Sequence, residues 1–255
     1  MKRNTTRCYL FIITGVFILL QSLQVQAHPG WGIQVNSKGE ILFADVGNTT
    51  IWKLLPDGNL SALVADTWTH SIHLDDTDNL YYGKEEYRGE VGPYNSFWKL
   101  SAEGSEKVLI APVLNRDWFL GNNALVDSSE NIYYFNRSGM LKRNREGEHT
   151  LLAEFEKRAM TTMVMGPGNA IYVTNGDTLQ KVLLTDGHKT TLAKALLTDP
   201  ADDPFFPGGE FNDVLGFDVA ENGDIYIAYF GNRRLLKIKP DGTKTEIYHS
   251  KAPWS

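Results

Sequence analysis

The sequence is poor in cysteine and in concentrated positive charge. Its 255 residues include one Cys, and Lys+Arg 25 against Asp+Glu 31 gives a formal net charge of −6. A single cysteine excludes a disulfide scaffold and a zinc module built on cysteine ligands. Without a Lys/Arg-rich run the chain cannot present the positive surface that phosphate neutralisation requires. We therefore expect no nucleic-acid partner.

Helical periodicity and familiar catalytic motifs are also missing. Apolar residues almost nowhere recur at the spacing of an amphipathic helix. The chain contains no Gly-x-Ser-x-Gly elbow, P-loop, dinucleotide fingerprint or His-Glu-x-x-His motif. With 42% hydrophobic and 22% charged residues, its composition is that of a globular protein with one substantial core. The sequence therefore allows a more specific prediction of the fold than of the activity.

The first 27 residues have the pattern of a secretory signal peptide. Three basic residues precede an apolar run at 8–20, and a small-residue cleavage site ends at Ala27. An uncleaved membrane anchor is the alternative, but this run is well short of the ~20 residues that span a bilayer. We expect a signal peptide at 1–27 and a secreted or periplasmic mature protein at 28–255, with no stable membrane anchor after cleavage.

Five segments of the mature chain resemble one another. The first reads GIQVNSKGEILFADVGNTTIWKLLPDG over 32–58, and the last reads GFDVAENGDIYIAYFGNRRLLKIKPDG over 216–242. Each holds short runs of alternating apolar residues between Gly-containing turns, which is the pattern of β-hairpins. When the segments are aligned, the first core position is occupied by Ile33, Ile72, Ala124, Met163 and Phe217.

Repeated units of four short strands predict the fold. Such units, each of about 40 residues, are typical of a β-propeller, in which every blade packs between two neighbours. We predict an all-β propeller of four-stranded antiparallel blades at about 31–66, 70–113, 122–156, 161–195 and 215–250. A β-sandwich or jelly roll is the alternative, but neither repeats one Gly-to-Gly span five times.

Unequal spacing between the repeats locates three insertions, at residues 84–96, 112–121 and 196–213. In a propeller, the loops between second and third strands and those between blades share one face, here called the top face. All three insertions map to it, and they are rich in aromatic and acidic residues. We take Glu85, Glu86 and Trp118 as candidate ligand contacts. Solvated surface decoration is the alternative.

The residue two positions before each aligned core residue is expected at the mouth of the central channel. This column reads Trp31, His70, Asn122, Thr161 and Leu215. His70 and Asn122 are its strongest potential ligands, and with Glu85 or Glu86 they are candidates for holding a divalent cation such as calcium or zinc. Trp31 and Thr161 are further candidate contacts. Strand alternation places His73 on the opposite face from His70, which makes His73 the weaker candidate.

The segments GEILFADVGNTTIWKLLPDG and GDIYIAYFGNRRLLKIKPDG resemble NHL-type repeats. The mature chain resembles the six-bladed, TolB-like propeller superfamily that includes senescence marker protein and gluconolactonase. In the lactonases, the column before the inner strands supplies Glu, Asn, Asn and Asp ligands to a divalent cation that polarises the lactone carbonyl. Asn122 alone matches that set. Six blades are usual in this superfamily, so we expect this chain to be a fragment that lacks the last blade.

Two classes of function follow. The first, which we favour, is a secreted NHL-like propeller that binds a small molecule, a glycan or a protein partner on its top face. Stacking on exposed rings and hydrogen bonding to carboxylates would provide the affinity. The second is a divalent-metal-dependent hydrolase or lactonase of the gluconolactonase type, with a rearranged metal site.

Overall fold

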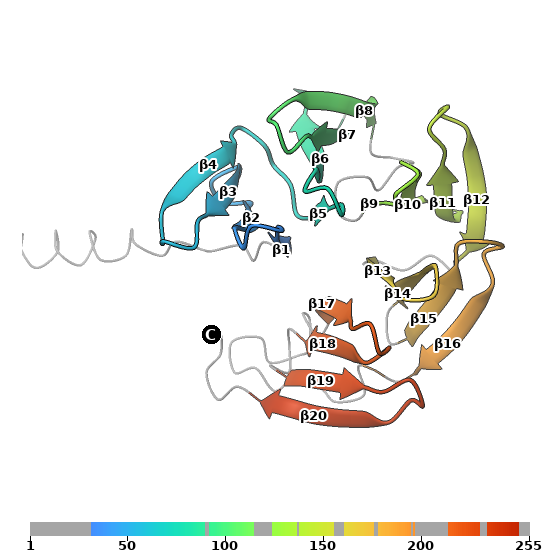
Figure 1. The fold of residues 1–255 in the computed structure, drawn as a ribbon. Coiled ribbons are helices and arrows are strands. Elements are labelled where there is room, and N and C mark those ends of the chain that lie inside the picture. The colour runs from blue at the N-terminus through green and yellow to red at the C-terminus, as the bar shows by residue number, and fades with distance from the viewer. Residues whose placement is uncertain are drawn as a thin grey trace, which may run out of the picture.

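Five four-stranded antiparallel sheets make up the protein. The computed structural model describes residues 32–89, 92–114, 124–136, 138–155, 161–175, 178–194, 196, 214–229 and 234–249. Each sheet contains four strands that are consecutive in the sequence, and Figure 1 shows the sheets as blades with their first strands innermost. The predicted all-β propeller is confirmed. No helix in the described part of the chain is long and apolar enough to cross a membrane.

The strands of the first three blades are β1 (Ile33–Val35), β2 (Ile41–Asp45), β3 (Thr50–Leu54) and β4 (Leu60–Val64) in blade 1; β5 (Ile72–Leu74), β6 (Leu80–Tyr87), β7 (Pro93–Leu100) and β8 (Glu106–Leu114) in blade 2; and β9 (Leu125–Val126), β10 (Ile132–Asn136), β11 (Gly139–Arg143) and β12 (His149–Glu154) in blade 3. The strands of the last two are β13 (Thr161–Gly166), β14 (Ala170–Asn175), β15 (Thr178–Leu183) and β16 (Lys189–Ala193) in blade 4; and β17 (Val214–Val219), β18 (Ile225–Tyr229), β19 (Arg234–Ile238) and β20 (Lys244–His249) in blade 5.

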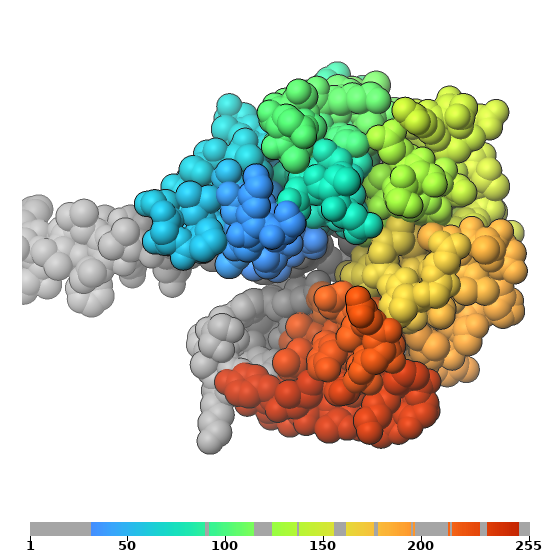
Figure 2. Space-filling view, in the orientation of Figure 1, coloured from blue at the N-terminus to red at the C-terminus, as the bar shows by residue number. Residues whose placement is uncertain are grey.

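The core lies between consecutive blades. Buried apolar side chains form four clusters, one at each junction from blades 1 and 2 to blades 4 and 5. At the first junction Ile51 of β3 packs in one cluster with Leu80 and Tyr82 of β6. At the last junction Tyr172 of β14 packs with Ile227 of β18. Figure 2 shows the blades following one another from blue blade 1 to red blade 5.

Burial along the second strands distinguishes inner blades from terminal ones. In β14 of blade 4, all residues from 170 to 174 are buried, so both faces of that strand pack against neighbours. In β18 of blade 5 burial alternates, and Tyr226 and Ala228 are exposed. Ile33 and Val35 of blade 1 are also exposed. Each terminal blade therefore packs against a described neighbour through one face.

Two matching turns fix the inner strands of blades 2 and 3. Asp75 accepts hydrogen bonds from the backbone N–H of Asn79 at 2.9 Å and from the Tyr81 hydroxyl at 3.0 Å. Asp127 occupies the same place in blade 3 and accepts a bond from the Tyr133 hydroxyl at 2.8 Å. Burial raises the pKa of Asp75, but the hydrogen bonds outweigh it and lower the pKa to about 2. The turns hold the ends of β5 and β9 in place beside the channel.

Blade 1 offers a matched test of this packing. Ile51 has 0% of its surface exposed, whereas Ile33 on the same blade is 64% exposed. Ile51→Ala is expected to lower the free energy of unfolding by about 2–5 kcal/mol because it opens a cavity between two blades. Ile33→Ala should change it by no more than about 0.5 kcal/mol. Urea unfolding of both variants measures the difference, and equal losses would contradict the assignment of the core to the blade junction.

Candidate functional site

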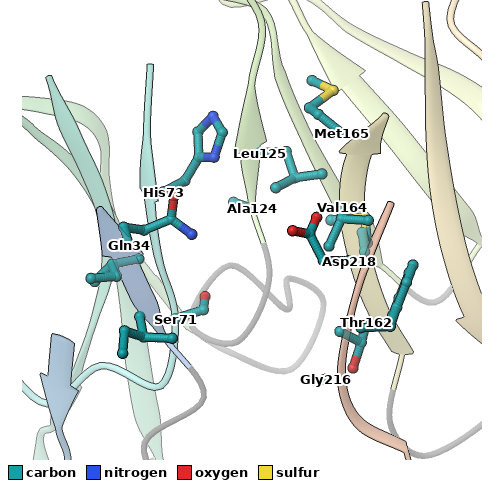
Figure 3. Close-up of a pocket in the computed structure, with 14 residues that line it drawn as sticks. Gln34, Ser71, His73, Ala124, Leu125, Thr162, Val164, Met165, Gly216 and Asp218 are labelled. Carbon is teal, nitrogen blue, oxygen red and sulfur yellow. The ribbon is translucent and has the colours of Figure 1, made fainter. Parts of the chain in front are cut away.

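The inner strands surround a cavity of about 440 Å³ at the centre of the propeller. The described residues that line it come from β1, β5, β13 and β17 and from the start of blade 3 at β9. Figure 3 shows polar and apolar side chains directed into it. The polar ones are Gln34, Ser71, His73, Thr162 and Asp218. Leu125, Val164 and Met165 contribute apolar wall.

One position of the repeat supplies a lining residue from every blade. The residues that directly follow the aligned core positions are Gln34, His73, Leu125, Val164 and Asp218, and all five line the cavity. Successive side chains of a strand point to opposite sides, so each of these residues lies on the side of its strand opposite the aligned core residue. Four of those core residues, Ile72, Ala124, Met163 and Phe217, are buried, whereas Ile33 on terminal blade 1 is exposed and the expectation that it is a core residue is wrong.

His73 is a neutral polar group of this wall. It lies opposite Tyr81 in the β5–β6 pairing, with 6.2 Å between the ring centroids. Burial lowers the pKa of His73 below its ordinary value of 6.5, although a hydrogen bond with the backbone of Val126 and the nearby carboxylates of Asp75 and Asp76 oppose the shift. A neutral imidazole has one donor and one acceptor nitrogen. Because the hydrogen bond with the Val126 backbone raises the pKa, the ring N–H donates it, and the other ring nitrogen of His73 is an acceptor near pH 7.

Asp218 faces the channel from blade 5. Its neighbours Phe217 and Val219 are buried, whereas Asp218 is exposed, as strand alternation requires. One carboxylate oxygen accepts a hydrogen bond from the Val219 N–H at 2.8 Å. Figure 3 shows the carboxylate pointing into the cavity from the wall opposite His73 and Gln34.

The rim at blade 2 brings His70 and Glu85 to the same end of the sheet. Because β5 and β6 are antiparallel, the start of β5 and the end of β6 lie together. The Trp68 ring centroid lies 5.5 Å from that of His70 and 5.3 Å from that of Tyr87. The Glu85 N–H donates a hydrogen bond to the Trp68 carbonyl at 3.0 Å. An aromatic group and a carboxyl therefore occupy one patch of the rim.

Two adjacent glutamates on this rim have opposite environments. Burial raises the pKa of Glu85, although its hydrogen bond with the Tyr87 side chain lowers it. The hydrogen bond from Arg88, with a contact of 2.8 Å, lowers the pKa of Glu86, and Lys84 at 3.8 Å acts in the same direction. Glu86 thus forms salt bridges with Arg88 and Lys84, which makes Glu85 the better candidate for a ligand contact.

The other predicted site residues are described less fully. Thr161 begins β13, where only its backbone is described. Trp31, Trp118 and Asn122 lie outside the described residues. Their convergence with His70 stays a prediction.

The described residues do not fit a divalent-cation site. Among them, no three His, Cys, Asp or Glu side chains gather closely enough to hold a metal ion. Zinc takes three or four protein ligands, and calcium takes six to eight oxygens. His70 is flanked by an indole ring, and Glu86 is paired with Arg88. The ligand set implied by the lactonase resemblance is therefore not assembled in this part of the chain.

Comparison with known proteins identifies relatives by structure alone. No protein-family model and no curated sequence matches the chain. Virginiamycin B lyase from Staphylococcus aureus is similar in structure, with a TM-score of 0.57 and 13% identity over 91% of this chain and 73% of that one. The chain has the propeller fold.

Two further solved structures share that fold. A gluconolactonase from Xanthomonas campestris has a TM-score of 0.57 and 13% identity over 84% of this chain and 73% of its own. An auxiliary nutrient binding protein from Bacteroides ovatus has a TM-score of 0.60 and 10% identity over 85% of this chain and 56% of its own. The TM-scores show a common propeller fold. Identities this low show nothing about the activity of this chain, which has to be inferred from its own residues.

The environment of His73 predicts how stability depends on pH. Because its pKa is lowered on folding, the unfolded chain binds more protons than the folded one below pH 6.5. Stability should therefore be fully present above pH 6.5 and fall as the pH drops below that value. Urea unfolding between pH 5 and 8 should show a shallower acid slope for His73→Gln, with no change of slope between pH 7.5 and 8. An unchanged acid slope would contradict the assignment.

Proposed function

We propose that this protein is an exported propeller that binds a small polar molecule in its central channel. The observation that carries the proposal is the cavity between the five inner strands, with polar groups on an apolar wall. Its volume of about 440 Å³ lies in the range of small-molecule sites, and such sites combine a few polar anchors with apolar surface. A folded protein cannot enter a space of that size, so a small molecule or the terminal sugar of a glycan fits better.

The aromatic rim of blade 2 supports entry from the top face. Trp68 and Tyr87 lie beside the start of β5, whose residues Ile72 and His73 line the cavity. Aromatic rings of this kind stack on planar or sugar rings, and the Glu85 carboxyl beside them adds a hydrogen-bonding group. A ligand that projects from the channel would meet this rim first on the blade 2 side.

The structural relatives are compatible with this proposal. One is called a nutrient binding protein, and a variant of the Staphylococcus aureus lyase was solved with quinupristin. The signal-like residues 1–27, together with a relative from Bacteroides that binds nutrients, favour a secreted or periplasmic location. We assign the same kind of small-molecule partner to this chain.

Filling the channel tests the site. Ligands are first found by a thermal-shift screen of sugars, lactones, amines and short peptides with the wild-type protein. Thr162→Trp should then weaken binding of any hit at least tenfold, because the indole would occupy cavity space lined by Thr162. Thr190→Trp is the matched control, since Thr190 is exposed on the outermost strand of the same blade. Binding that survives Thr162→Trp, or that both variants weaken equally, would contradict a channel site.

Metal analysis separates this proposal from the hydrolase alternative. We expect the protein purified in the presence of calcium and zinc to hold substoichiometric metal, because the described residues do not assemble a ligand set. Elemental analysis of the wild type, His70→Ala and Asn122→Ala measures it. Stoichiometric metal that either substitution removes would instead favour a metal-dependent hydrolase built on His70 and Asn122.

A further inference from the structure

Asp218 is the carboxylate of blade 5 that lines the cavity, whereas Asp224 and Glu246 form salt bridges with Lys237 and Arg234. Its own hydrogen bond is the local one from Val219 N–H. Among the described residues, no lysine or arginine forms a salt bridge with it. A channel carboxylate that no described basic side chain neutralises favours a cation from solution.

The nearest basic side chain in the same cross-strand row is already engaged. Asp218 pairs with Tyr226, and Tyr226 pairs with Lys237 on the next strand. The Lys237 ammonium lies 2.6 Å from Asp224 and 5.5 Å from the Tyr226 ring centroid. Lys237 is therefore paired with Asp224.

The remaining described lining adds no formal charge to the channel. Gln34, Ser71 and Thr162 are uncharged, and burial keeps His73 neutral near pH 7 by lowering its pKa. The described lining contains no lysine or arginine. An aspartate is negative at neutral pH, so the described wall carries one negative charge from Asp218.

We infer that the channel selects a small molecule that carries a cationic amine, with Asp218 as its counter-ion. The amine binds on the blade 5 side, and Gln34 and His73 on the opposite wall hydrogen-bond to polar groups of the ligand (Figure 3). Leu125 and Val164 contact its apolar part. This inference rests on the proposed function and adds the charge of the ligand to it.

Two matched sets of probes test the charge preference by isothermal titration calorimetry. The first is glucosamine, glucose and glucuronate, and the second is tyramine, 4-ethylphenol and 3-(4-hydroxyphenyl)propionate. In each set that binds, the amine should bind about tenfold more tightly than the neutral member, as expected for a hydrogen bond between charged groups. The preference should shrink as ionic strength rises.

Substitution of the counter-ion provides the decisive comparison. Asp218→Asn keeps an oxygen that can accept the Val219 N–H, so the fold is preserved while the charge is lost. It should reduce the amine preference to no more than about twofold and leave the affinity of the neutral members unchanged. Glu221→Gln removes the same charge from an exposed turn of the same blade and should leave the preference intact.

The outcomes separate the two proposals. If neutral or acidic members bind as tightly as the amines, or if the preference survives Asp218→Asn, the charge inference is wrong and the channel remains a small-molecule site. Amine binding that Thr162→Trp does not weaken also overturns the inference. If no member of either set and no compound of the screen binds the wild-type protein, both proposals are wrong.

Discussion

The packing of apolar side chains between consecutive blades is the constraint on which this structure depends. Ile51, Ile171 and Ile227 belong to three different junctions, and each is completely buried. Both faces of a blade that lies between two neighbours are packed. A polar group placed on either face would lose its hydration, which costs free energy. Function is therefore restricted to the parts of a blade that do not pack, which are the channel side of the inner strand and the loops at the two ends.

This restriction explains why a repetitive fold can have an irregular site. The five residues that follow the aligned core positions occupy equivalent places, yet they are Gln34, His73, Leu125, Val164 and Asp218. Leu125 and Val164 pack at blade junctions, whereas Gln34, His73 and Asp218 belong to no core cluster, so the fold tolerates apolar, polar and charged residues at this position. The neighbouring core positions hold Ile, Ala, Met and Phe. The repeat thus determines the position of each lining residue in the blade but not the type of its side chain.

The fold could be predicted because its signals are local. Alternating apolar residues and Gly-containing turns specify the hairpin between the third and fourth strands of each blade, and Gly58 in one such turn has a φ of 89°, which glycine adopts without strain. The site was predicted less well. The column containing His70 lies two residues before the core position, whereas the lining residues His73 and Asp218 directly follow it, and the same alignment shifted along the strand would have found them. The contrast between Glu85 and Glu86 depends on burial and on Arg88, which residue spacing does not encode.

At four of the five lining positions, polarity follows the exposure of the blade, and His73 of blade 2, which packs between two neighbours, is the exception. Leu125 of blade 3, which has a packed neighbour on each side, is 7% exposed, and Val164 of blade 4 is half-buried against the junction with blade 5. Asp218, on a terminal blade, is exposed, and Gln34 on the other terminal blade is half-buried. A carboxylate on blade 3 would have to be desolvated, whereas on blade 5 it keeps contact with water. At these five positions the channel is polar toward blades 5, 1 and 2 and apolar toward blades 3 and 4, and Thr162 adds one hydroxyl group on blade 4.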